Sequence, residues 1–160
     1  MVNFMLAGVG GQGILVAAEL VALVGMELGL DVKESEIHGI AQRGGSVNSE
    51  VRWGEHVYSP LILPGEVDFL LAFERLEALR YLDLLRPEAI VLCNDYTIPP
   101  ITAAVDTKGN PLPTAAEEKA AYAEIGHYFV PAMSIAQELG NLRVSNVVLL
   151  GALSALMDVP

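Results

Sequence analysis

VNFMLAGVGGQG, residues 2–13, contains the clearest structural signal in this chain. The apolar run Val2–Ala7 predicts a buried strand, and the glycine cluster that follows interrupts it. The segment Gln12–Leu28 then places its apolar residues on roughly one face of a helix. Leu30–Ile37 predicts a second strand. Strand, glycine turn, helix and strand together indicate a βαβ unit of about the expected length.

A hairpin is predicted directly after the second loop. Val47–Trp53 and His56–Ser59 alternate in polarity, and the turn residues Gly54-Glu55 separate them. Two alternating runs separated by two turn residues are typical of antiparallel strands. The sheet is therefore expected to contain one antiparallel hairpin.

The rest of the chain alternates between strand-like and helix-like segments. A proline-rich excursion at Tyr96–Pro113 is expected to lie on the surface, and Thr114 with Glu117 has the spacing of a capping box that begins a helix. The other predicted elements are strands at Val67–Phe73, Ala89–Asn94 and Tyr128–Pro131, and helices at Glu74–Leu85, Ser134–Leu139 and Val144–Met157. This order predicts an α/β fold: a three-layer Rossmann-like open sheet, mostly parallel, in a single domain over residues 1–160.

Composition narrows the function classes. The 52% hydrophobic content suits strands covered by helices on both faces, or a subunit that hides surface against a partner. The formal net charge of −11 would repel a phosphate backbone, so nucleic acid is not an expected partner. No uncharged stretch has the length of a membrane span, and the first basic residue is Lys33, so neither a membrane segment nor a secretory signal is expected and the predicted location is cytoplasmic.

The sequence contains few cysteines and histidines that could serve as metal ligands or catalytic groups. Cys93 is the only cysteine, which leaves an iron–sulfur cluster without its usual four thiolates, and its apolar surroundings predict a packed small hydrophobe. His38, His56 and His127 lack metal-ligand spacing. Glu74 is interpreted as a helix-start charge. No metal site and no catalytic residue is predicted on this chain.

The glycine loop is the strongest candidate for ligand binding. Gly8-Val9-Gly10-Gly11-Gln12-Gly13 satisfies G-x-G-x-x-G between a predicted strand and a predicted helix, where free N–H groups meet an anion. We interpret Gly8, Gly10, Gly11, Gln12 and Gly13 as cofactor-binding. Glu34 and Glu36 lie near the position where an acidic residue would bind the ribose of NAD, which keeps a nicotinamide or flavin enzyme open. A tight turn without a ligand is the structural alternative.

A second loop supplies the countercharge that an acidic chain needs. In HGIAQRGGS, residues 38–46, Arg43 precedes Gly44 and Gly45, which leave its guanidinium little covered. Arginine favours planar, bidentate recognition of phosphate or carboxylate. Arg43, Gly44 and Gly45 are therefore assigned to cofactor binding, with a surface or interface salt bridge as the alternative for the arginine. His38, Gln42 and Ser46 are assigned to the substrate or partner side.

The two loops together resemble a known family. G-x-G-G-x-G followed by R-G-G is similar to the gamma domain of pyruvate and other 2-oxoacid ferredoxin oxidoreductases, and HGIAQRGGS resembles the small (beta) subunit of the indolepyruvate type. The likeness covers almost the whole chain, except the proline-rich region and the tail, since family members usually continue past the equivalent of Pro160. Further matching segments are Ser59–Ile62, Pro64–Glu66, Asp68, Glu74, Glu77–Arg80, Gly140-Asn141 and Asn146–Leu153.

The resemblance implies a function that this chain cannot perform alone. Enzymes of the family oxidatively decarboxylate a 2-oxo acid, here an aryl pyruvate, to an acyl-coenzyme A and reduce ferredoxin. Thiamine diphosphate and 4Fe–4S clusters belong to the large alpha subunit, in a heterodimer or heterotetramer. This chain would contact coenzyme A through the glycine loop and Arg43. The alternatives are an NAD(P)- or flavin-binding Rossmann oxidoreductase acting alone, and a binding module with an empty glycine turn.

Overall fold

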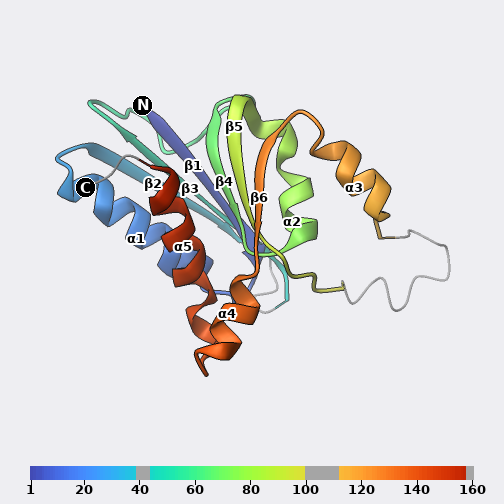
Figure 1. The fold of residues 1–160 in the computed structure, drawn as a ribbon. Coiled ribbons are helices and arrows are strands. Elements are labelled where there is room, and N and C mark those ends of the chain that lie inside the picture. Colours follow the sequence, from blue (N-terminus) through green and yellow to red (C-terminus); the bar gives the residue numbers. More distant parts are fainter. Residues whose placement is uncertain (39–43, 100–111, 158–160) are drawn as a thin grey trace.

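The protein is seen here in a computed structural model, which describes residues 1–38, 44–99 and 112–157 (Figure 1). Eleven helices and strands and two short 3-10 turns follow one another along these ranges. They are β1 (Val2–Val9), α1 (Ile14–Glu27), β2 (Asp31–His38), β3 (Ser46–Gly54), β4 (Val67–Ala72), α2 (Arg75–Arg80), η1 (Leu82–Leu84), β5 (Leu85–Asn94), α3 (Ala115–Ala121), β6 (Gly126–Val130), α4 (Ala132–Glu138), η3 (Leu142–Val144) and α5 (Ser145–Leu156).

The strands form one six-stranded sheet in the order β2-β3-β1-β4-β5-β6. β1, β4, β5 and β6 pair in parallel, and β3 runs antiparallel to both of its neighbours, β1 and β2. Helices α1 and α5 lie on one face of the sheet and α2 and α3 on the other (Figure 1). The predicted fold class, a mostly parallel three-layer sheet with an antiparallel hairpin, is confirmed.

The position of the hairpin was predicted wrongly. Its arms are β2 and β3, with Asp31 opposite Gly54 and His38 opposite Val47, whereas residues 56–59 form no strand. The Val57 N–H instead donates to Asp31 Oδ2 at 2.8 Å, and the Val57 side chain is buried. This contact ties the segment to the start of β2, so the chain does not turn back along β3. Because β3 lies between β1 and β2 in the sheet, these two strands of the predicted βαβ unit are not neighbours.

Two further boundaries differ from the sequence prediction. Helix α2 ends at Arg80, and β5 begins at Leu85, four residues before the predicted start at Ala89. The early part of β5 contains Pro87, which has no N–H for the ladder, and Glu88, whose φ is 68°. The β4–β5 register shifts at the same place. Because of this irregularity, the early part of β5 lacks the alternation of polar and apolar residues from which a strand is predicted.

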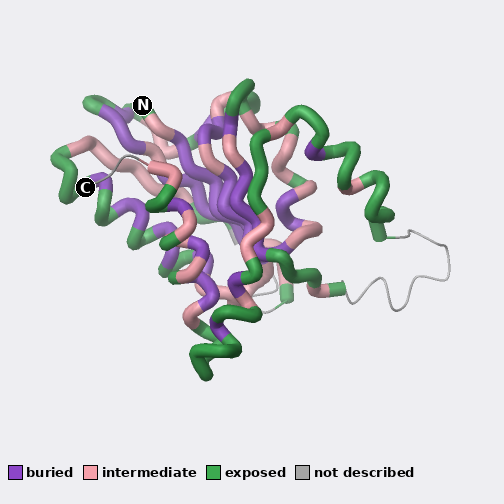
Figure 2. Tube along the Cα trace, viewed as in Figure 1, coloured by how far each residue is buried: buried purple, intermediate pink, exposed green. Residues whose placement is uncertain are grey.

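Burial is concentrated in the central strands of the sheet (Figure 2), and alternation along β1 divides the core into two clusters. Phe4 and Leu6 pack toward α1 and α5, whereas Met5 and Ala7 pack on the other face. Cys93 belongs to the second cluster with 1% exposure, and burial raises the pKa of its thiol to about 12, as expected for a packed hydrophobe. Within the described ranges, no helix is long and apolar enough to cross a membrane.

Two helical glycines provide a test of this packing. A Cβ on Gly25 in α1 would lie 2.5 Å from Nε1 of buried Trp53, whereas a Cβ on Gly151 in α5 would meet no atom within 4 Å. We expect Gly25→Ala to destabilise the protein by ~1–3 kcal/mol through overpacking. Gly151→Ala should stabilise it by ~0.5–1 kcal/mol through helix propensity. Urea denaturation of both variants measures this, and shifts of the same sign would contradict the packing described.

Candidate functional site

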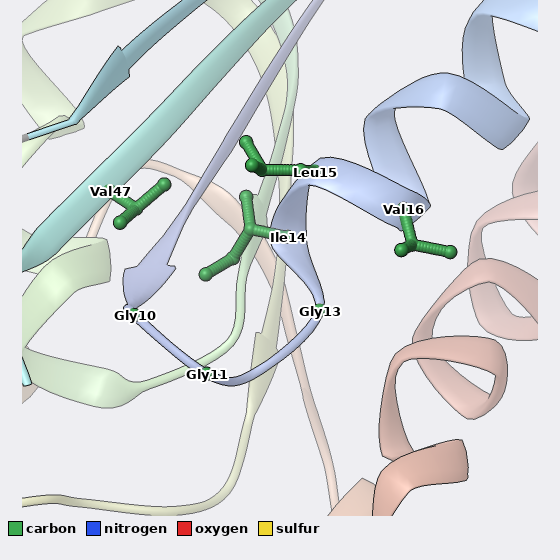
Figure 3. Close-up of a pocket in the computed structure, with 7 residues that line it drawn as sticks. All are labelled: Gly10, Gly11, Gly13, Ile14, Leu15, Val16 and Val47. Carbon is green, nitrogen blue, oxygen red and sulfur yellow. The ribbon is translucent and has the colours of Figure 1, made fainter. Parts of the chain in front are cut away.

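The glycine turn, residues 9–13, lies at the carboxyl end of β1 (Figure 3). From β1 the chain passes through α1 toward β2 at one edge of the sheet, and from β4 it passes through α2 to β5 toward the other. The neighbouring strands β1 and β4 therefore form the topological switch point. In open α/β sheets this is the place where ligands bind, outside the carboxyl ends of the strands.

The side chain of Gln12 gives the turn its shape. Its Oε1 accepts from the Val9 N–H at 2.7 Å, and its Nε2 donates to the Phe73 carbonyl at 3.0 Å. The Gln12 N–H also donates to the Val9 carbonyl at 3.2 Å. The amide therefore faces the protein and joins the end of β1 to the residue after β4. Sequence reasoning placed Gln12 among ligand contacts, and it did not foresee this role in shaping the turn.

Three glycines of the motif, one at the end of β1 and two in the turn, have different surroundings. A Cβ on Gly8 would lie 2.6 Å from Gln12 Oε1, and one on Gly13 would lie 2.7 Å from Asn146 Nδ2. Gly13, with φ of 79°, and Gly11, with φ of 105°, have backbones that favour glycine. A Cβ on Gly11 would meet nothing within 4 Å. Gly8 and Gly13 therefore permit close packing, whereas Gly11 faces open space that a ligand can approach.

The N–H groups of the turn divide into two sets. Those of Gly10 and Gln12 donate to the carbonyls of Gly45 at 2.9 Å and Val9 at 3.2 Å. Those of Gly11, Gly13 and Ile14 have no acceptor among the residues that the structure describes. They stand at the N-terminus of the 14-residue helix α1, where the helix dipole favours an anion. The donors left for a ligand thus exclude Gly10 and Gln12, which the sequence indicated, and include Ile14, which it did not.

A cavity of about 470 Å³ opens beside this turn (Figure 3). Its lining residues are Gly10, Gly11, Gly13, Ile14, Leu15, Val16 and Val47. Leu15 and Val16 are exposed although both are apolar. The cavity therefore combines backbone donors with an apolar wall, which fits a ligand that has an anionic part next to an apolar part.

A second cavity, of about 380 Å³, lies between the turn and helix α2. Ser46 Oγ donates to Glu77 Oε2 at 2.5 Å, and Arg80 Nε lies 3.2 Å from Glu77 Oε1. Glu77 is 5% exposed, and its pKa is raised by desolvation, against the lowering effects of Ser46 and Arg80. Glu74 caps α2 by accepting from the Glu77 N–H at 2.9 Å, which confirms its helix-start role. Glu77 lines this cavity, and sequence reasoning did not assign it to the candidate site.

The structure brings the two predicted loops together. Besides the Gly10–Gly45 hydrogen bond, the Gly44 N–H lies 3.5 Å from the Gly10 carbonyl, and Ser46 borders the second cavity. His38 ends β2 opposite Val47. Gln42 and Arg43 lie outside the described residues. Among the residues that are described, no cluster of three histidines, cysteines or carboxylates is placed to hold a metal ion.

The geometry does not favour the dinucleotide alternative. The acidic residue that binds an NAD ribose stands at the end of the strand next to the glycine strand. Glu34 and Glu36 lie on β2, which is an edge strand separated from β1 by β3. The candidate acids are therefore one strand too far from the glycine turn.

Comparison with known proteins gives a consistent result. The family described as pyruvate ferredoxin/flavodoxin oxidoreductase matches residues 3–160. The chain is 41% identical over 155 residues to indolepyruvate oxidoreductase subunit IorB of Thermococcus kodakarensis, covering 95% of this chain and 76% of the relative. It is 38% identical to the IorB subunit of Methanothermobacter thermautotrophicus, covering 99% of this chain and 80% of the relative.

Solved structures share the fold. The gamma subunit of a keto/oxoacid ferredoxin oxidoreductase from Geobacter sulfurreducens superposes with a TM-score of 0.69 at 23% identity, covering 99% of this chain and 79% of that one. A 2-oxoglutarate:ferredoxin oxidoreductase from Magnetococcus marinus, with 2-oxoglutarate, coenzyme A and succinyl-CoA bound, gives a TM-score of 0.73 at 23% identity, covering 99% of this chain and 24% of that one. With the family match over residues 3–160 and the IorB relatives, the chain belongs to the pyruvate ferredoxin/flavodoxin oxidoreductase family.

Proposed function

We propose that this chain is the small subunit of an indolepyruvate-type 2-oxoacid:ferredoxin oxidoreductase. The complex would oxidatively decarboxylate an aryl pyruvate, transfer the acyl group to coenzyme A and reduce ferredoxin. The observation that carries this proposal is the 41% identity to an IorB subunit over 95% of the chain. The position of Glu34 and Glu36 on an edge strand disfavours an independent dinucleotide enzyme.

The chemistry would be divided between subunits. Thiamine diphosphate and the 4Fe–4S clusters would reside on a large alpha subunit, because the only cysteine of this chain is buried Cys93 and a cluster normally needs four thiolates. Residues 1–160 would form one gamma-type domain that completes the complex in the cytoplasm. It would supply binding and positioning, and no catalytic residue.

Coenzyme A is the ligand that we assign to the glycine turn. The N–H groups of Gly11, Gly13 and Ile14 at the start of α1, which have no acceptor among the described residues, fit a pyrophosphate, and the open space at Gly11 lets it approach. The thiol of coenzyme A takes up the acyl group. Arg43, Gly44 and Gly45 would also contact the cofactor, with the Arg43 guanidinium as countercharge, and His38, Gln42 and Ser46 would face the substrate or the partner.

Anaerobic co-purification tests the subunit assignment. A tagged chain is isolated from its native cells, and the iron and thiamine diphosphate in the purified material are measured. We expect a large partner that carries both and transfers electrons from an aryl pyruvate to ferredoxin. Recovery of the chain alone with bound NAD or flavin would instead support the independent enzyme.

Arg43 provides a separate test of the coenzyme A site. In the intact complex, Arg43→Ala should raise the apparent KM for coenzyme A by ~10-fold or more, because a charge-assisted contact to phosphate is lost. The KM for the 2-oxo acid should change little. Arg143→Ala, on the 3-10 turn before α5, is the control. Impaired assembly with unchanged coenzyme A kinetics would assign Arg43 to the subunit interface.

A further inference from the structure

The cavity beside α2 is distinct in chemistry from the one beside α1, although both border the glycine turn. Val9 lines the α2 side and Gly10 the α1 side, so consecutive residues of the turn separate the two cavities. The cavity beside α2 is lined by Val9, Gly44, Ser46, Glu74, Leu76, Glu77, Arg80, Ile98 and Pro99. A ligand held at the turn is therefore within reach of both.

The charges of the cavity beside α2 decide which part of a ligand it accepts. Both carboxyl groups, Glu74 and Glu77, are at least nine-tenths buried, at 1% and 5% exposure. A phosphate would be repelled here, and Arg80 is already paired with Glu77. The apolar residues Leu76 and Ile98 complete the wall. This combination fits an uncharged chain that carries hydrogen-bond donors.

The two carboxylates have different tasks. Glu74 is occupied as the cap of α2, since its oxygens accept from the Glu77 N–H at 2.9 Å and from the Ile98 N–H at 3.1 Å. Among the residues that the structure describes, the Glu77 carboxylate contacts only the side chains of Ser46 and Arg80, and each of its oxygens has acceptor capacity left for a ligand. Ser46, on β3, fixes the orientation of the Glu77 carboxylate on α2, and both residues line the cavity.

We propose that Glu77, positioned by Ser46, accepts a hydrogen bond from an amide N–H of the uncharged arm of coenzyme A, while the turn binds its phosphates. This inference rests on the function proposed above. It explains why a carboxylate is retained where burial disfavours its charge, a feature that occurs more often at functional sites than elsewhere. Glu77 is thereby a binding residue that the glycine motif does not include.

Calorimetric titration of the purified complex tests this contact with two probes. Coenzyme A carries both the phosphates and the amide arm, whereas adenosine 3′,5′-bisphosphate has phosphates and no arm. We expect Glu77→Gln to weaken coenzyme A binding by roughly 3- to 10-fold and Glu77→Ala by at least about 10-fold, because a charged acceptor is weakened or removed. Adenosine 3′,5′-bisphosphate should bind all variants equally.

Glu50→Gln is the matched control. Glu50 is also a buried carboxylate, at 7% exposure, but it accepts from the Ile62 N–H at 2.8 Å and lies outside the lining of this cavity. We expect the coenzyme A affinity of Glu50→Gln to equal that of the wild type.

The stability of Glu77→Gln can be predicted from the electrostatics. Since burial raises the pKa of Glu77, the charged carboxylate destabilises the native state as the pH rises above the ordinary pKa of a glutamate. Glu77→Gln should therefore melt no lower than wild type at neutral pH, and it carries the test if Glu77→Ala does not assemble.

The outcomes separate the two proposals. Unchanged coenzyme A affinity in Glu77→Gln and Glu77→Ala would overturn the contact, as would an equal loss for both probes, since Glu77 would then act on the phosphates or the fold. A wild-type complex that binds neither probe would overturn the coenzyme A site itself.

Discussion

Gly13→Val is expected to destabilise the protein by roughly 3 kcal/mol or more and to abolish coenzyme A binding. Gly13 is the N-cap residue directly before α1, and its φ of 79° is a conformation that costs other residues ~1–2 kcal/mol. Its new Cβ would also lie 2.7 Å from Asn146 Nδ2, so the Asn146 side chain at the start of α5 would have to shift. Displacement of the helix start would misdirect the N–H groups on which the anion site depends.

Gly140→Val separates backbone strain from steric conflict. Gly140 has nearly the same φ, 75°, but a Cβ there would meet nothing within 4 Å. Chemical denaturation should show a loss of only ~1–2 kcal/mol for this control. Adding Asn146→Ala to Gly13→Val should recover part of the difference. Equal losses for both valine variants would contradict the close packing of α1 on α5 at Gly13.

Gln12→Ala is expected to raise the apparent KM for coenzyme A by about 10-fold or more and to destabilise the protein by ~2–3 kcal/mol. The substitution leaves the Val9 N–H without its acceptor and removes one of two donors to the Phe73 carbonyl, since Asn94 Nδ2 also reaches it at 3.2 Å. The turn then loses its connection to β4. The kinetic effect follows from a misplaced backbone, because the amide itself faces the protein.

The control for this variant is Gln137→Ala, which removes an exposed glutamine from α4. Its stability and coenzyme A kinetics should match wild type within error. The measurements are steady-state kinetics of the complex and urea denaturation of the chain. A Gln12→Ala variant with full stability and a raised KM would show instead that the amide contacts the ligand directly.

Local patterns were sufficient for most of the fold. The apolar run of β1, the glycine turn and the periodic helix follow directly from residues 2–28, and the Thr114 capping box forms as predicted. Strand pairing was harder to predict from local patterns, because it depends on which backbone groups distant in the sequence meet in the fold. The His56–Ser59 segment alternates like a strand, yet the bond from the Val57 N–H to Asp31 holds it elsewhere.

The sequence identified the glycine turn and its proximity to the second loop, but only some of the residues that line the candidate site. The motif identifies the turn because glycine spacing is a local property, and the contact of Gly10 with Gly45 joins the two loops as their chemistry suggested. Glu77 was missed because a glutamate three residues before Arg80 resembles an ordinary solvated helix pair. Its burial against Ser46 arises only when β3 and α2 meet, and no local pattern records that.

The most direct test of the account is the rate of ferredoxin reduction by the purified complex, with an aryl pyruvate as donor, measured with and without this chain. We predict that turnover requires the chain, saturates with coenzyme A and forms an acyl-coenzyme A. A large subunit that shows the same coenzyme A-dependent rate alone would contradict a role for this chain in the reaction.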